Sequence, residues 1–218
     1  MVISGRRIFL ALTASCLLAV ATGARAAQPD GTRVVTMLGD SLTAGLGLPA
    51  DQAIPARLQE ALRQRGLKVT VRPAGVSGDT SADGLARVDF SVKPDTDLCL
   101  VVLGGNDLLQ GVDPKQLKAN LTAIVSRLKA RHMRVLLVGL KAPPTLGAGY
   151  AKDFDQAFVD VAKTEGVPLF PDLLGKVALD RTLNQGDGVH PNAAGVKQVV
   201  ARLSPAVAGV LGRESAKL

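Results

Sequence analysis

Five short apolar runs, separated by segments with helical spacing, constrain the fold of this chain more than any other feature. The runs are rich in Val and Leu, and they cover residues 33–38, 68–72, 98–103, 134–140 and 167–170. They are continuous rather than alternating, which is typical of strands covered on both faces. Helical patterns cover residues 54–65, 113–130, 151–165 and 193–211. The alternation predicts an α/β fold, with a mostly parallel sheet between two layers of helices.

Local signals predict where several of these helices begin and end. Asp113 is a suitable N-cap, and Pro114 suits the first helical position. Gly166 is expected to end the helix that precedes it. Pro205 lies inside the last helical pattern, where it predicts a kink or a break.

The first residues form a pattern of their own. Arg6 and Arg7 precede an apolar run over residues 8–21, which ends near the small-residue pattern Ala24-Arg25-Ala26. The run is shorter than the ~20 apolar residues of a spanning helix, and the pattern predicts a secretory signal peptide over residues 1–26. Cleavage is expected after Ala26 or Ala27. The mature chain, residues 27–218, would then be one domain in the periplasm or outside the cell. General secretion is the expected route, although the arginine pair also partly matches a twin-arginine signal.

Composition limits the partners of the mature chain. Removing three arginines with the leader lowers the formal net charge from +7 to +4. Aromatic residues are 3% of the chain, and no basic cluster is interleaved with them. This charge and composition are not typical of a nucleic-acid-binding protein. Cys99, the one mature cysteine, lies in the run LCLVVL and is predicted to be a buried core residue.

Polar and glycine-rich segments follow the predicted strands. They read GDSL at 39–42, PAGVSGDTS at 73–81, GGND at 104–107, KAPPTLGAGY at 141–150 and GDGVHPN at 186–192. The carboxyl ends of parallel strands share one edge of a sheet, so these segments are expected to converge. Each one alone also fits a turn or a helix cap. His132 precedes a strand, and we expect it at the opposite edge in a structural role.

Together, the segments contain the groups that acyl transfer requires. A serine hydroxyl needs a base within reach, and histidine suits neutral pH. Ser41 is the candidate nucleophile, His190 the candidate base and Asp187 the acid that orients its ring. Asn106 can donate a side-chain N–H and Gly78 a backbone N–H to a developing oxyanion. This chemistry requires no metal and no cofactor.

These segments resemble the conserved blocks of the GDSL, or SGNH, hydrolase family. Ser41 in GDSL, Gly78 in SGDTS, Asn106 in GGND, and Asp187 with His190 in DGVHPN occur in the family's order. The chain is most similar to the bacterial periplasmic subgroup of acyl-CoA thioesterases, lysophospholipases and arylesterases. The resemblance implies a three-layer α/β/α sandwich with a five-stranded sheet, the flavodoxin-like SGNH fold. It also implies a Ser41–His190–Asp187 triad, and an oxyanion hole formed by Ser41, Gly78 and Asn106. Loops 108–112 and 143–150 would border the acyl groove.

Three other interpretations fit the sequence less well. The α/β-hydrolase motif G-x-S-x-G fails at Asp79, which occupies the last glycine position. A metal-dependent phosphoesterase would need several histidines, and only His190 is suitably placed. A non-catalytic exported binding module is disfavoured by the intact set of site residues.

The expected substrate is a small acyl ester or thioester. A carbohydrate O-deacetylase on the same fold is the alternative, but the mature chain has no Trp and only Tyr150 to stack on sugars. Leu108, Leu109, Pro143, Pro144 and Leu146 favour acyl chains instead. Transient contact with membrane lipid is compatible with such a substrate, and no nucleic acid is expected as a partner.

Overall fold

The computed structural model describes Met1 and residues 30–212. Apart from Met1, the signal peptide predicted over residues 1–26 and its cleavage point lie outside the described residues.

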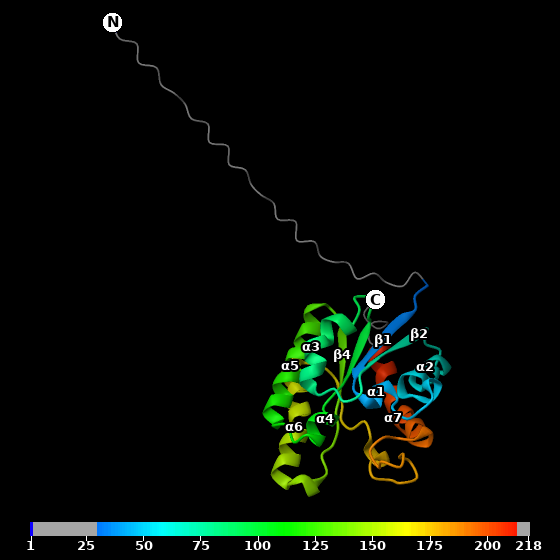
Figure 1. The fold of residues 1–218 in the computed structure, drawn as a ribbon. Coiled ribbons are helices and arrows are strands. Elements are labelled where there is room, and N and C mark those ends of the chain that lie inside the picture. Colours follow the sequence, from blue (N-terminus) through cyan, green and yellow to red (C-terminus); the bar gives the residue numbers. More distant parts are fainter. Residues whose placement is uncertain (2–29, 213–218) are drawn as a thin grey trace.

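A five-stranded sheet forms the centre of the molecule (Figure 1). Its strands are β1 (Arg33–Gly39), β2 (Val69–Gly75), β3 (Leu98–Val102), β4 (Arg134–Val138) and β5 (Leu169–Phe170). Their order is β2-β1-β3-β4-β5, and every neighbouring pair is parallel. The predicted parallel sheet is therefore confirmed.

Helices cover both faces of this sheet, and the predicted three-layer α/β/α sandwich is also confirmed. The helices are α1 (Ser41–Ala44), α2 (Ile54–Gln64), α3 (Ser81–Ser91), α4 (Gly105–Leu109), α5 (Pro114–Ala130), α6 (Ala148–Glu165) and α7 (Ala193–Gly212). Short 3₁₀ turns occupy Ala50–Gln52, Pro144–Leu146 and Gly175–Val177. The pair α2 and α7 packs on one face, whereas α3, α5 and α6 pack together on the other.

The signals predicted at Asp113, Pro114 and Gly166 are confirmed by the structure. Asp113 caps α5 by accepting a hydrogen bond from the Lys115 N–H, and Pro114 is the first residue of α5. Gly166 ends α6 in the left-handed conformation, with φ of 65°. Of the two outcomes predicted at Pro205, a kink or a break, the break does not occur, since α7 is continuous from Ala193 to Gly212.

Several elements differ from the sequence prediction, which did not include the short helices α1 and α4 and placed the start of α6 at residue 151 rather than at Ala148. Strand β2 runs past Pro73 to Gly75, which is possible because β2 is the edge strand and proline does not have to donate to a further neighbour. Helix α3 was missed. Its apolar pattern is weak, but its first turn carries a capping box formed by Thr80 and Asp83. Gly84 lets α3 pack closely, since a Cβ there would lie 2.2 Å from Leu103 Cδ1.

The sheet interior positions the ends of β1 and β3 beside each other. Residues of β3 are fully buried, and Cys99 among them is a core residue as predicted. Burial raises the pKa of the Cys99 thiol to about 12, so it stays protonated and unreactive.

The order of the strands in the sheet reverses between β1 and β3, because β2 lies on one side of β1 and β3 on the other. In open parallel sheets, ligands bind beyond the carboxyl ends of the strands at such a reversal.

Candidate active site

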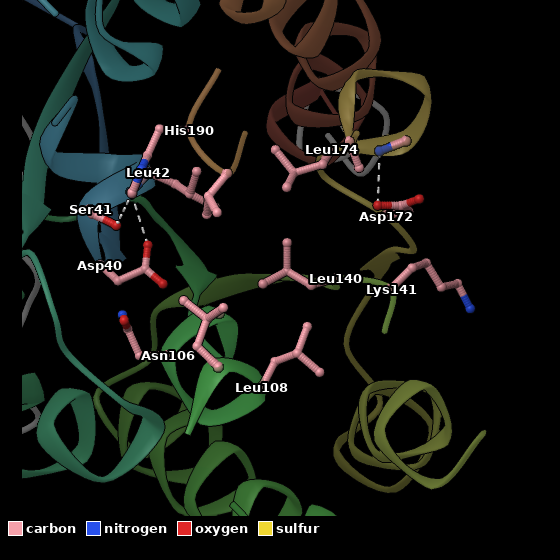
Figure 2. Close-up of a pocket in the computed structure, with 15 residues that line it drawn as sticks. Asp40, Ser41, Leu42, Asn106, Leu108, Leu140, Lys141, Asp172, Leu174 and His190 are labelled. Atoms are coloured by element: carbon pink, nitrogen blue, oxygen red, sulfur yellow. Dashed lines mark hydrogen bonds between the residues drawn. The ribbon is translucent and has the colours of Figure 1, made fainter. Parts of the chain in front are cut away.

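Ser41 lies at this reversal, in the first turn after β1 (Figure 2). Asp40 is the N-cap of α1, and its Oδ1 accepts a hydrogen bond from the Leu42 N–H at 3.0 Å. Its backbone carbonyl accepts further bonds from the N–H groups of Thr43 and Ala44. These bonds fix the tight turn that presents the Ser41 hydroxyl at the edge of the sheet.

The His190 loop, residues 185–191, brings two more predicted residues to Ser41. His190 Nε2 lies 2.8 Å from Ser41 Oγ, and His190 Nδ1 lies 2.7 Å from Asp187 Oδ2. The N–H groups of Val189 and His190 donate to Asp187 Oδ1 at 2.9 and 3.0 Å. Asp187 accepts a hydrogen bond from the Nδ1–H group of His190. A neutral imidazole carries only one N–H, so Nε2 has no proton and can accept one from Ser41.

Asn106 and Gly78 come from the segments after β3 and β2. Asn106 is the second residue of α4, and its Nδ2 donates to the Asp79 carbonyl at 2.9 Å. A side-chain amide has two N–H donors, so this bond orients the second one. Gly78 lies in the exposed turn just before Asp79 with φ of 92°, a conformation that favours glycine.

A buried polar network joins the same two segments behind the site. Asp107 is 1% exposed, and its carboxylate accepts from both the N–H and the hydroxyl of Ser81, at 2.7 and 2.5 Å. Asn120 donates to the Ser81 hydroxyl at 2.9 Å. No sequence signal pointed to a role for Asp107. It follows Asn106 directly in GGND, and the structure uses it to hold the start of α3.

An apolar cavity of about 180 Å³ opens beside Ser41 (Figure 2). Ser41, Asn106 and His190 line it, whereas Gly78 and Asp187 are exposed and lie outside the lining. Its apolar walls come from Leu42, Leu108, Leu109, Leu140, Leu174, Ala178 and Val189. Figure 2 shows the pocket extending from Ser41 past Leu108 and Leu140 toward Asp172. The loop after β3 therefore lines the cavity as expected. Its facing wall comes from residues 174–178 rather than from the expected residues 143–150, and no sequence signal singled out those residues.

Two carboxylates near Ser41 have opposite electrostatic environments. The backbone N–H groups of His190 and Val189, followed by the His190 ring, lower the pKa of Asp187 to about 2. Burial raises the pKa of Asp40 to about 6, although the Leu42 N–H and the nearby His190 partly oppose this. Asp187 therefore stays ionised across the neutral range, while Asp40 titrates just below neutrality.

The described part of the chain offers neither a cluster of metal ligands nor a helix that could cross a membrane. Within residues 30–212, no three His, Cys, Asp or Glu side chains gather closely enough to share a metal ion. The metal-dependent alternative therefore has no ligand set in that range. None of the helices described there has the length and apolar character needed to span a bilayer. His132 is exposed in the turn that precedes β4, the edge of the sheet opposite Ser41.

The similarity of this chain to known proteins identifies its family. The sequence profile of the GDSL-like lipase/acylhydrolase family matches residues 37–198. Esterase TesA of Pseudomonas aeruginosa is 35% identical over 185 residues, which are 84% of this chain and 92% of the relative. Thioesterase 1/protease 1/lysophospholipase L1 of Escherichia coli is 38% identical over 169 residues, 77% of this chain and 78% of the relative. The crystal structure of AlinE4, an SGNH-hydrolase family esterase, is 44% identical with a TM-score of 0.69, and the match covers 83% of this chain and 97% of that one. The chain belongs to the GDSL-like lipase/acylhydrolase family and is a hydrolase of the SGNH type.

Proposed function

We propose that the protein is an esterase that hydrolyses carboxylic esters and thioesters through a covalent acyl-enzyme on Ser41. The observation that carries this proposal is the hydrogen-bonded chain from Ser41 Oγ through His190 to Asp187, with distances of 2.8 and 2.7 Å. A serine, a histidine and a carboxylate in this arrangement activate the hydroxyl as a nucleophile.

The proposed reaction has two steps. Ser41 Oγ attacks the carbonyl carbon while His190 Nε2 takes its proton, and Asp187 stabilises the imidazolium that forms. The negative oxygen of the tetrahedral intermediate accepts hydrogen bonds from the Asn106 amide and the backbone N–H groups of Ser41 and Gly78. His190 then protonates the leaving alcohol or thiol. Water, activated by the same histidine, releases the acid and restores Ser41.

The cavity supports an acyl chain as the group that is transferred. Its walls are mostly leucine and other aliphatic side chains, with one group of polar side chains at the Ser41 end and Lys141 and Asp172 at the other. Such a pocket favours alkyl groups and offers few partners to the hydroxyls of a sugar, so it disfavours carbohydrate O-deacetylation. Aryl esters, acyl-CoA and lysophospholipids are the proposed substrates, and the similarity to proteins named esterase, thioesterase and lysophospholipase supports these classes of ester and thioester.

A substrate panel tests this proposal. The purified protein is assayed against aryl esters of graded acyl length, a lysophospholipid, an acyl-CoA and an acetylated sugar, with Ser41→Ala and His190→Ala alongside. We expect turnover of the acyl substrates and a loss of at least ~10⁴-fold in both variants. Activity confined to the acetylated sugar would favour the deacetylase. Loss of activity with a strong chelator would favour a metal enzyme.

We also propose that the enzyme is exported and contacts membrane lipid transiently. The leader pattern predicts export, by general secretion or the twin-arginine route. Six large apolar side chains are exposed in the segments that follow the strands: Leu46, Val76, Leu109, Leu146, Leu179 and Val189. Two of them, Leu109 and Val189, line the cavity. Exposed apolar groups near an active site suit an amphiphilic substrate. Fractionation of cells that express the full chain tests the first point, and sedimentation with phospholipid vesicles tests the second. Recovery of uncleaved protein in the cytoplasm would contradict export.

A further inference from the structure

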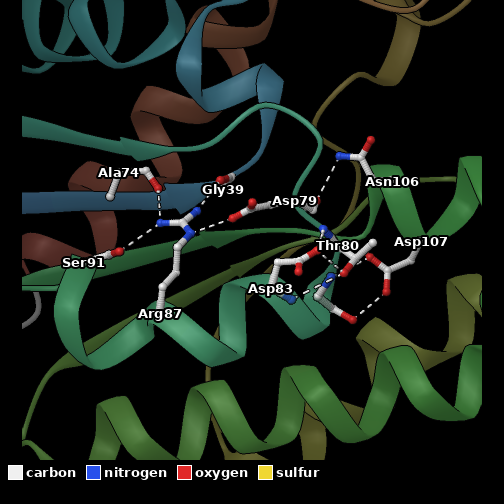
Figure 3. Close-up of polar contacts among 10 residues, drawn as sticks. Gly39, Ala74, Asp79, Thr80, Asp83, Arg87, Ser91, Asn106 and Asp107 are labelled. Carbon is white, nitrogen blue, oxygen red and sulfur yellow. Dashed lines mark hydrogen bonds and ion pairs between the residues drawn. The ribbon is translucent and has the colours of Figure 1, made fainter.

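Arg87 of α3 joins several segments that surround the site (Figure 3). Its Nη2 donates to the Gly39 carbonyl at 2.8 Å, and its Nη1 donates to the Ala74 carbonyl at 2.9 Å. Its Nε donates to Asp79 Oδ2 at 2.5 Å. Nη1 also reaches the Ser91 hydroxyl at 3.0 Å. One guanidinium therefore ties together the end of β1, the end of β2 and the loop that follows β2.

These contacts lead directly to the proposed oxyanion-binding groups. Gly39 lies two residues before Ser41, and its carbonyl also accepts from the Val76 N–H at 3.1 Å. Asp79 follows Gly78, and its own carbonyl accepts from Asn106 Nδ2 at 2.9 Å. Arg87 thus fixes the carboxylate of Asp79, and the backbone carbonyl of Asp79 in turn fixes the side-chain amide of Asn106.

An arginine suits the contact with Asp79, Gly39 and Ala74 better than a lysine would. The side chains of Arg87 and Asp79 are only 19% and 11% exposed, so each charge depends on the other. A guanidinium carries five N–H donors in a fixed plane and can serve several acceptors at once, which a lysine ammonium on a flexible stem does less well.

We propose that Arg87, acting through Asp79, is a positioning residue for the oxyanion hole. The inference rests on the proposed acyl-enzyme function. Small displacements of groups that meet the transition state reduce rates strongly, by about 10²-fold for ~1 Å. Arg87 itself does not line the acyl cavity, which Leu108 and Leu140 help to form. Replacement of Arg87 therefore weakens stabilisation of the transition state more than it weakens substrate binding.

Arg87→Met tests the proposal, with Arg72→Met as the matched control. Arg72 forms a two-bond pair with Asp95 at 2.8 Å, and Asp95 lies in the connection that enters β3, away from Ser41. We expect Arg87→Met to lower kcat for an aryl ester by about 10–100-fold, below the full loss of one oxyanion donor. KM should stay within about threefold, and Arg72→Met should keep kcat within about twofold of the wild type.

An inhibitor comparison separates positioning from general damage. An aryl boronic acid, which forms a tetrahedral adduct with a serine hydroxyl, should bind Arg87→Met more weakly in proportion to the loss of kcat/KM. A fatty acid, which occupies the cavity without forming an adduct, should bind both arginine variants like the wild type. A fall in kcat equal to that of Arg72→Met, or a change confined to KM, would overturn the proposal.

Two further variants test the proposal if Arg87→Met does not fold or if the acyl-enzyme function is wrong. If Arg87→Met does not fold, Asp79→Asn carries the test, since it keeps the size of the side chain and removes its charge. We expect a smaller kcat loss with the same inhibitor signature, and an unchanged kcat would overturn the proposal. Ser41→Ala is measured in parallel. Full activity in that variant would mean that the acyl-enzyme function, and not the positioning role of Arg87, has failed.

Discussion

The groups around Asn106 are held by buried bonds between distant segments, whereas those around His190 are held by an exposed loop that bonds largely to itself. Asp107, which supports the first region, is 1% exposed, while the side chain of Asp187 in the second is 46% exposed. Asp187 takes its hydrogen bonds from residues two and three positions along the chain. The proposed oxyanion region is therefore part of the folded core, and the His190 loop is attached to it.

This difference indicates that the two regions respond to mutation in different ways. Changes in the His190 loop should reduce catalysis with little effect on folding, because few buried contacts are lost. Changes behind Asn106 should reduce both, since each buried polar group loses its partner.

The largest expected effect is that of Asp187→Asn. The uncharged amide leaves the His190 tautomer unfixed and the imidazolium unsupported, and we expect kcat to fall by about 10²–10⁴-fold. The exposed side chain predicts a change in unfolding free energy of less than about 1 kcal/mol. Asp40→Asn, beside Ser41 but outside the triad, should cost less than about tenfold in kcat. Equal losses in the two variants, measured with one aryl ester, would contradict these assignments.

Asn106→Ala is expected to have the next largest effect on catalysis. Loss of one oxyanion donor reduces kcat by about 10²–10³-fold. The bond to the Asp79 carbonyl is lost as well, so unfolding by urea should also shift, by about 1 kcal/mol. A normal kcat with only a lower midpoint of unfolding would make Asn106 a structural residue.

Asp107→Ala tests the buried region directly. It leaves the N–H and the hydroxyl of Ser81 without their acceptor, and we expect a loss of about 3 kcal/mol in unfolding free energy. Urea denaturation of this variant beside Asp187→Ala checks the comparison. Similar losses in the two variants would show that the regions are equally integrated.

The smallest expected effect is a pH dependence of stability from Asp40. Its pKa rises from an ordinary value near 4 to about 6 on folding, so between these values the folded state holds more protons than the unfolded state. This group therefore lowers stability as pH rises through that window. The Tm advantage of Asp40→Asn should grow between pH 4 and 6, to roughly 5 °C, and then level off. A Tm difference between Asp40→Asn and the wild type that does not vary with pH would show that the buried charge of Asp40 does not lower stability.

The sequence predicted the sheet, the main helices and the juxtaposition of Ser41 with His190 because each depends on a local or repeated signal. Apolar runs mark the strands, and parallel strands bring their carboxyl ends to one edge. Contacts such as Arg87 with Asp79 and Asp107 with Ser81 carry no such signal, since the side chains meet only after α3 has packed on the sheet. Leu174 and Ala178 in the cavity wall were missed for the same reason. Pro205 shows the converse, because tertiary packing kept a helix intact through a residue that favours breaking it.

The most direct test of the central claim is the reaction of Ser41 with a fluorophosphonate. The folded protein is treated with the reagent, digested and mapped by mass spectrometry, with Ser41→Ala and His190→Ala as controls. The account predicts one adduct on Ser41, none in Ser41→Ala, and strongly slowed labelling in His190→Ala. An unlabelled Ser41 in folded, wild-type protein, or equal labelling in His190→Ala, would contradict it.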